Sequence, residues 1–202
     1  MLKTVFEGEE IIHRLLWGIV KEQAKEAQEC QEGWFNPSVV ARVFAYHTVE
    51  AYLNYVGERI APEIWQDERN YFRNAPYRGA SGKLRKVMDL VALPWRDKER
   101  PLRTILELKH SRDLIAHGKA EKLCDTVIHP ADTDAPYPVS KLRELIEPKD
   151  TLALVVLPDV EELLDDIHTR AKSLLKVPDE WFGKEALQGP CWYSSHTTGP
   201  NC

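Results

Sequence analysis

Apolar side chains recur at helical spacing along most of this chain, and this periodicity is the feature that most restricts its fold. We predict long helices over residues 4–32, 38–60, 82–93, 101–117 and 159–176, and a short helix over residues 63–73. Short connections between such helices are typical of an up-and-down bundle. The predicted fold class is therefore all-α.

Serine, proline and glycine mark the expected ends of these helices. Ser38 and Ser81 are candidate N-caps, because a serine hydroxyl accepts a hydrogen bond from a free backbone N–H. Pro101 suits a first helical turn, where its missing N–H costs nothing. Gly118 is expected to follow its helix in the left-handed conformation.

Irregular, proline-rich sequence interrupts the helical pattern between about residues 120 and 157. We interpret this stretch as an insertion in a helical domain that spans residues 1–177. Two short apolar runs, 126–128 and 152–157, predict a small β-hairpin before the last helix. The remaining residues, 178–202, are expected to form a C-terminal tail that is either docked on the domain or partly disordered.

The composition is typical of a soluble protein with an ordinary hydrophobic core. Hydrophobic residues make up 43% of the chain and charged residues 29%. No apolar run approaches the roughly 20 residues that a membrane helix needs, and the N-terminus lacks the apolar core of a signal peptide, so we expect a cytoplasmic protein without membrane contact. The four cysteines are scattered and form no CxxC pair, which predicts unpaired thiols.

Charge is distributed unevenly along a chain whose net charge is −5. Residues 69–119 carry 13 Lys or Arg against 5 Asp or Glu, whereas the segments on either side are acidic. Such a basic segment either attracts phosphates or pairs with acidic helices of the same molecule. The residues that we expect to contact an RNA backbone are Arg73, Arg78, Lys83, Arg85, Lys86 and Lys109. The alternative is that these side chains form a solvated helix face.

The basic segment ends in the run Arg112-Asp113-Leu114-Ile115-Ala116-His117-Gly118. It places a guanidinium, which binds phosphate through several donors, near an imidazole, which transfers protons at neutral pH. Arg112 and His117 lie about 140° apart around an ideal helix, whereas Asp113 and His117 share a face. Two copies that meet at a symmetry axis would bring two arginines and two histidines into one cleft. These groups are the minimal parts of a metal-free phosphodiester-cleaving site.

This run resembles the R-x4-6-H signature of HEPN domains, the nucleotide-binding domains of higher eukaryotes and prokaryotes. The segment from Ala45 to Asn54 is similar to an early core helix of that family, and the resemblance covers roughly residues 35–175. HEPN domains are helical and commonly dimeric, and many are metal-independent ribonucleases of toxin–antitoxin or RNA-defence systems. The resemblance therefore implies a homodimer that cleaves RNA without a cofactor, and it implies an antitoxin or a nucleotidyltransferase as a further partner.

The same resemblance implies roles for individual residues. Arg112 would hold the scissile phosphate and stabilise its developing charge. His117 would act as general base or acid on the 2′-hydroxyl or the leaving oxygen, and Asp113 would orient His117 or help to position the pair. Apart from the resemblance, packing in a helical bundle would place Glu50 and Asn54 of the earlier helix beside Arg112 in a supporting role. Other HEPN domains are not catalytic, so the alternative is a nucleotide- or RNA-binding or protein-interaction module.

A purely structural role for these residues stays open. In that case, Arg112 would form a salt bridge with Glu50 or another carboxylate, and the helix dipole alone would favour His117 in a last turn. Glu50 and Asn54, four residues apart, would then be a buried hydrogen-bonded pair.

A metal site is a further alternative. His110, Asp113 and His117 line one helix face, and their side chains are suitable zinc ligands. The two histidines, however, lie about 10 Å apart along an ideal helix axis, so a partner helix would have to complete the site.

Overall fold

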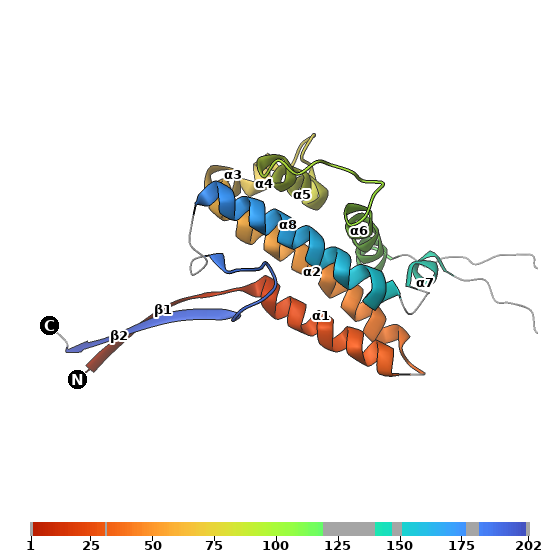
Figure 1. Cartoon of the computed structure of the whole chain (residues 1–202), viewed down its shortest axis with the longest axis horizontal. Helices are drawn as coiled ribbons and strands as arrows, with labels where there is room; N and C mark the ends of the chain where they lie inside the picture. Colours follow the sequence, from red (N-terminus) through yellow and green to blue (C-terminus); the bar gives the residue numbers. More distant parts are fainter. Residues whose placement is uncertain (1, 31, 119–139, 147–150, 177–181, 201–202) are drawn as a thin grey trace, which may run out of the picture.

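One long helix occupies the centre of a mostly helical structure (Figure 1). The computed structural model describes residues 2–30, 32–118, 140–146, 151–176 and 182–200. The helices are α1 (Ile12–Glu29), α2 (Phe35–Ile60), α3 (Pro62–Gln66), α4 (Glu68–Tyr71), α5 (Gly79–Leu90), α6 (Leu102–Ala116), α7 (Lys141–Ile146) and α8 (Leu157–Leu175). The strands are β1 (Leu2–Glu10) and β2 (Trp192–Pro200). The predicted all-α character is confirmed in this coarse sense.

The central helix is α2, which contacts α1, α5, α6 and α8. Tyr46, Val49, Tyr52, Leu53 and Val56 are all at most 3% exposed. These positions lie within about 120° of one another around an ideal helix, so they form one face of α2 that packs against the neighbouring helices. The core therefore forms along this face of α2.

Helix directions depart from the alternation expected of an up-and-down bundle. α1 and α2 form an antiparallel pair, but α8 runs alongside α2 in the same direction (Figure 1). Two hydrogen bonds establish this direction. Arg42, early in α2, donates to Thr151, which precedes α8. Tyr52, later in α2, is hydrogen-bonded to His168, later in α8. The elements α3 to α7 separate α2 from α8 in the sequence, so no short turn forces these two helices to be antiparallel.

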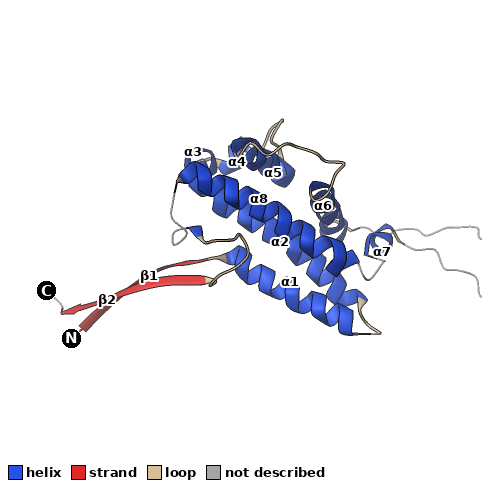
Figure 2. Ribbon diagram, viewed as in Figure 1, coloured by secondary structure: helices blue, strands red, loops and turns tan. Residues whose placement is uncertain are grey.

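The predicted helix over residues 4–32 is wrong in its first third. Residues 2–10 form β1, which pairs antiparallel with β2, with Val5 opposite Thr197 and Glu10 opposite Trp192. β-Branched and aromatic residues in both segments favour strands, and Gly8 disfavours a helix. The two strands form an arm that projects from the helices (Figure 2).

The predicted hairpin before the last helix is also wrong where the structure describes it. Residues 152–156 form a π-helical turn that leads directly into α8. Leu152 and Val156, one turn apart, are 1% and 3% exposed, so a helical turn buries the apolar side chains that had suggested a strand. The expected partner run, 126–128, lies outside the described residues, as does most of the predicted insertion.

Several predicted helix ends differ from those observed. α2 begins at Phe35 and α5 at Gly79, so neither Ser38 nor Ser81 caps a helix. Ser38 is instead buried in the first turns of α2. α6 ends at Ala116 with His117 as its C-cap, and Gly118 is not among the described glycines with positive φ. The short helix expected over 63–73 is divided into α3 and α4.

The C-terminal segment docks on the helices over residues 182–187, where Phe182, Ala186 and Leu187 are buried. The ring of Phe182 stacks on that of His168, with centroids 4.4 Å apart. Beyond this segment the chain enters β2, and so the tail joins the N-terminus at the base of the arm. Residues 178–181 and 201–202 of the predicted tail lie outside the described residues. In the described part of the chain, no helix is long and apolar enough to span a bilayer.

Candidate functional site

Arg112 lies on α6 and reaches across to α2. Its Nη2 donates to Oε1 of Glu50 at 2.9 Å, and its Nη1 lies 2.8 Å from Oδ1 of Asp113. The side chain of Arg112 is 20% exposed and that of Glu50 is 27% exposed. The salt bridge between Arg112 and Glu50, which sequence reasoning left open as a structural alternative, is therefore present.

Asp113 contacts the cations around it rather than His117. Its Oδ2 accepts a hydrogen bond from Nζ of Lys109 at 2.5 Å, in addition to the contact with Arg112. Partial burial raises the pKa of the Asp113 carboxyl, but the Lys109 hydrogen bond and the charges of Lys109, Arg112 and His117 outweigh it and lower the pKa below its usual value. Asp113 is therefore an anion that holds Arg112 in place.

His117 is exposed at the C-terminal end of α6. Its backbone N–H donates to the carbonyl of Asp113, and its imidazole has no hydrogen bond to any residue that the structure describes. The expected orientation of His117 by Asp113 is thus not seen as a hydrogen bond. Asp113 contacts Arg112 alone of the Arg112–His117 pair, so its expected role in positioning the pair stays a prediction.

Tyr46 forms the inner wall of this group. The guanidinium carbon of Arg112 lies 4.9 Å from the centre of the Tyr46 ring, within cation–π range. Burial raises the pKa of Tyr46, and the nearby Glu50 carboxylate raises it further, so the phenol stays protonated at neutral pH. The Nε of Arg112 is buried and finds no hydrogen-bond partner in the described part of the chain. Burial thus leaves the Nε–H unsatisfied within the described residues.

Glu50 and Asn54 do not form the hydrogen-bonded pair considered above. Asn54 accepts instead from Nζ of Lys83 at 2.9 Å and from the Trp65 indole at 3.4 Å. Lys83 also donates to Glu68. Since Glu50 and Asn54 are one turn apart, α2 presents a polar stripe that receives Arg112 from α6 and Lys83 from α5.

His47 belongs to the same stripe, and sequence reasoning missed it. Its Nδ1 lies 3.1 Å from Oε2 of Glu50, and its side chain is 45% exposed. The i, i+3 spacing of His47 and Glu50 was a readable signal. Only the fold, however, brings Arg112 to the other oxygen of that carboxylate.

The expected RNA contacts divide into two groups. Lys83 and Lys109 are engaged in the carboxylate contacts described above, whereas Arg73, Arg78 and Arg85 are exposed. Two cations of α5 lie near aromatic rings: the exposed Arg85 is 5.8 Å from the ring of Trp95, and the half-buried Lys86 is 5.6 and 5.1 Å from those of Tyr71 and Tyr77.

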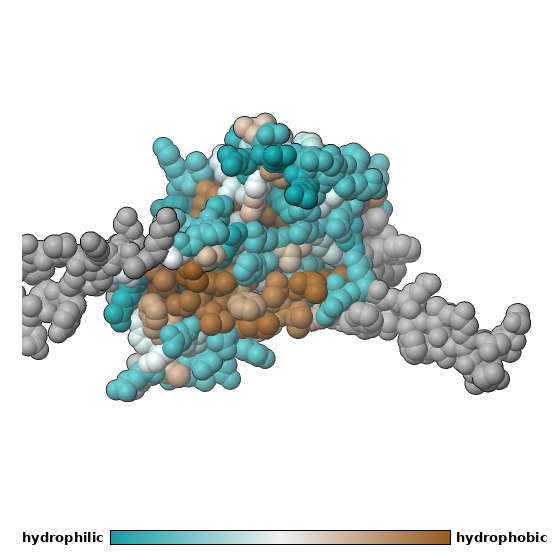
Figure 3. Space-filling view, turned by 180° about the vertical axis from the view of Figure 1, so that it is seen from behind, coloured by the Kyte–Doolittle hydropathy of each residue, from teal (hydrophilic) through white to brown (hydrophobic). Residues whose placement is uncertain are grey.

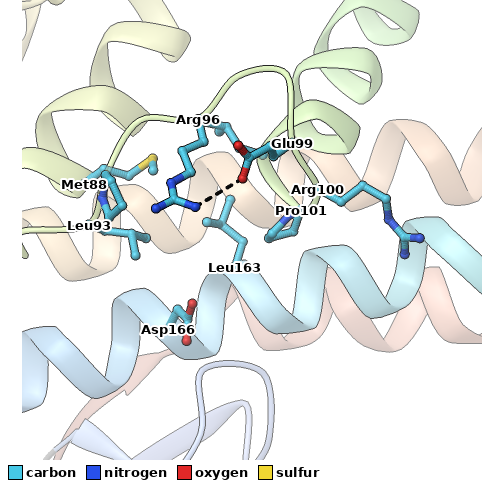
Figure 4. Close-up of a pocket in the computed structure, with 10 residues that line it drawn as sticks. Met88, Leu93, Arg96, Glu99, Arg100, Pro101, Leu163 and Asp166 are labelled. Atoms are coloured by element: carbon cyan, nitrogen blue, oxygen red, sulfur yellow. Dashed lines mark hydrogen bonds and ion pairs between the residues drawn. The ribbon is translucent and has the colours of Figure 1, made fainter.

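A separate cavity lies between α8 and the loop that joins α5 to α6. Met88, Leu93 and Leu163 line it, and Arg96 and Glu99 are ion-paired at its edge, 3.2 Å apart (Figure 4). None of the residues predicted to be functional lines this cavity. Among the described residues, no three His, Cys, Asp or Glu side chains gather in a way that would hold a metal ion, so His110, Asp113 and His117 do not form such a group.

Comparisons with protein-family models, with curated proteins and with solved structures found no match to this chain.

Proposed function

We propose that this protein is a metal-independent endoribonuclease of the HEPN type that acts as a homodimer. The observation that carries the proposal is the position of Arg112, which Glu50 of α2 and Asp113 hold in the last turns of α6, the helix that ends at the exposed His117. A fixed guanidinium and a solvent-accessible imidazole at one helix end supply a phosphate-binding group and a proton-transfer group, which two copies at a symmetry axis would bring into one cleft.

The chemistry requires RNA rather than DNA, because the nucleophile is the internal 2′-hydroxyl. Attack of this oxygen on phosphorus breaks the bond to the 5′-oxygen and leaves a 2′,3′-cyclic phosphate and a 5′-hydroxyl. Arg112 would stabilise the charge that develops on the phosphate oxygens through its guanidinium, whose side chain is 20% exposed. His117 would transfer a proton to or from one of the reacting oxygens.

Two cations of α5 next to aromatic rings support binding of a single RNA strand. Lys86 lies over Tyr71 and Tyr77, whose rings are themselves stacked with centroids 6.1 Å apart. Arg85 lies over Trp95. Cations contact the phosphate backbone and aromatic faces stack on bases, a combination that single-strand-binding proteins share. RNA would therefore run over α5 on its way to Arg112.

An apolar band supports dimerisation. Figure 3 shows hydrophobic side chains gathered in a broad band across the face opposite to that of Figure 1. On α1, Ile12 and Leu15 are 45% and 43% exposed, and Ile19 and Val43 of the adjoining α1 and α2 surfaces are half-buried. Contiguous apolar surface of this kind marks interfaces between proteins. A two-fold pair formed through it would bury the same side chains on both copies.

A non-catalytic RNA-binding module of the HEPN type is the second candidate function. The observation that favours it is the charge balance around Arg112. Glu50 and Asp113 both contact Arg112, and Asp113 also pairs with Lys109, so two carboxylates offset the two cations. Such an arrangement serves structure and binding as well as it serves catalysis.

RNA cleavage in the presence of EDTA tests the proposal. Wild-type protein is expected to cut a mixed-sequence RNA to products with 2′,3′-cyclic phosphate ends, and Arg112→Ala and His117→Ala are expected to lose at least about 100-fold in rate. His110→Ala is the matched control, because His110 is another exposed histidine of α6. Circular dichroism checks that each variant folds. RNA binding by folded wild type without cleavage would favour the second candidate function.

A further inference from the structure

Cleavage by the 2′-hydroxyl requires two proton transfers. A base removes the proton of the nucleophile, and an acid protonates the 5′-oxygen as it leaves. The R-x4-H motif contains one imidazole, His117. Within one protomer, the second proton transfer therefore needs another group, and the structure offers one on a different helix.

His47 of α2 is connected to Arg112 through a single carboxylate. Nδ1–H of His47 donates to Oε2 of Glu50 at 3.1 Å, and Oε1 of the same carboxylate accepts from Nη2 of Arg112 at 2.9 Å. Glu50 is thus bonded to both side chains at once. Exposure increases along this chain of contacts, from 20% at Arg112 to 27% at Glu50 and 45% at His47.

The hydrogen bond leaves the other imidazole nitrogen ready to act. With Nδ1 engaged by Glu50, the neutral ring carries its lone pair on Nε2, for which no partner exists among the described residues. A carboxylate that holds one ring nitrogen orients the imidazole and stabilises the cation formed when the other nitrogen accepts a proton. The ring of Phe44 packs edge-on against His47, with centroids 6.3 Å apart, and further restricts its orientation.

The other described histidines differ in their surroundings. His13 and His168 are buried and donate to the carbonyls of Ala186 and Gly183, which gives them structural roles. The rings of His110 and His117 have no hydrogen bond to any described residue. Of these described histidines, His47 is the exposed one that a carboxylate orients.

We propose that His47 is the general base of the reaction, and this inference rests on the ribonuclease function proposed above. Nε2 of His47 accepts the proton of the 2′-hydroxyl as the oxygen–phosphorus bond forms. The bond from phosphorus to the 5′-oxygen breaks, and His117 protonates the departing oxygen. Glu50 acts as a positioning residue for both His47 and Arg112.

The test compares wild type, His47→Gln and His117→Gln on two substrates in EDTA. One is a natural oligoribonucleotide, and the other carries sulfur in place of the 5′-bridging oxygen at the linkage that wild type cleaves. Sulfur leaves without being protonated, so a missing acid matters little for this substrate while a missing base still matters. Glutamine at position 47 retains a donor for Glu50 but does not titrate, and His110→Gln is the matched control.

We expect His47→Gln to slow cleavage of both substrates by about 100-fold and to remove the acidic limb of the pH–rate profile. His117→Gln is expected to slow cleavage of the oxygen substrate alone. A wild-type rate in His47→Gln would overturn the inference, as would an unchanged acidic limb or a defect that sulfur rescues. If wild type fails to cleave RNA, the proposed function itself is wrong, and the role of His47 is rejected with it.

Discussion

Arg112 and Glu50 join α6 to α2 through a hydrogen-bonded ion pair of 2.9 Å at the centre of the candidate site. The pair is only partly exposed, and Asp113 is also bonded to the guanidinium. Replacing Arg112 therefore leaves two carboxylates near each other with Lys109 as their remaining cation. This relationship makes the site a structural element as well as a candidate for chemistry.

Removal of Arg112 is expected to lower the free energy of unfolding by about 1 to 2 kcal/mol, between the values typical of exposed and of buried ion pairs. A double-mutant cycle with Arg112→Met and Glu50→Gln, measured by urea unfolding, is expected to give a coupling energy of about 1 kcal/mol. A coupling near zero would mean that the pair does not hold α6 on α2. His110→Ala, on the exposed face of α6, is expected to leave the stability unchanged.

Two helical glycines should respond in opposite ways to replacement by alanine. A Cβ at Gly57 of α2 would lie 2.1 Å from the ring of the buried Trp65, so Gly57→Ala is expected to destabilise the protein by about 1 to 3 kcal/mol despite the better helix propensity of alanine. A Cβ at Gly18 of α1 meets no atom within 4 Å. Gly18→Ala is therefore expected to stabilise by about 0.5 to 1 kcal/mol. Thermal unfolding of both variants measures the signs, and equal signs would contradict this packing.

The apolar band on α1 and α2 predicts a change of oligomeric state on substitution. Wild type is expected to be a dimer in size-exclusion chromatography with light scattering, and Leu15→Glu is expected to be a monomer because it places a charge within the band. Leu174→Glu is the matched control, since Leu174 is 56% exposed on α8. A monomeric wild type, or a Leu15→Glu variant as dimeric as wild type, would rule out this interface.

Local pattern was sufficient to predict most of the helices, because amphipathic spacing and helix breakers are local properties. The strands were missed because β1 depends on a partner that begins about 180 residues later in the chain, at Trp192. Residues 152–156 show the opposite error, in which a short apolar run looked like a strand but is buried as a helical turn. A run of this length does not distinguish the two by periodicity.

The candidate site shows the same division between local and long-range information. The motif from Arg112 to His117 is contiguous, so it was visible in the sequence, and Glu50 was a candidate partner. His47 was not associated with the motif, because its connection to Arg112 passes through Glu50 and exists only when α2 and α6 are packed. Lys83 likewise could not be assigned to Asn54 and Glu68 without the position of α5.

The docked C-terminal segment predicts a loss of stability in mild acid. His13 of α1 is 1% exposed, and its Nε2–H donates to the Ala186 carbonyl at 3.0 Å. Burial lowers the pKa of His13 to about 3, aided by the charges of Arg14, His168 and Arg59 and opposed by the Ala186 hydrogen bond. Burial also lowers the pKa of His168, which bonds to Gly183 of the same segment.

An unfolded histidine binds a proton near pH 6.5, so below that pH the unfolded chain holds a proton that the folded His13 lacks. The stabilisation is thus complete above pH 6.5 and is lost as the pH falls toward about 3, at about 1.4 kcal/mol per pH unit. Between pH 7.5 and pH 5, urea unfolding of wild type should show a loss about 2 kcal/mol larger than that of His13→Gln, whose amide donates to Ala186 without titrating. Equal losses in the two proteins would show that His13 is protonated in the folded state and that burial does not control its charge.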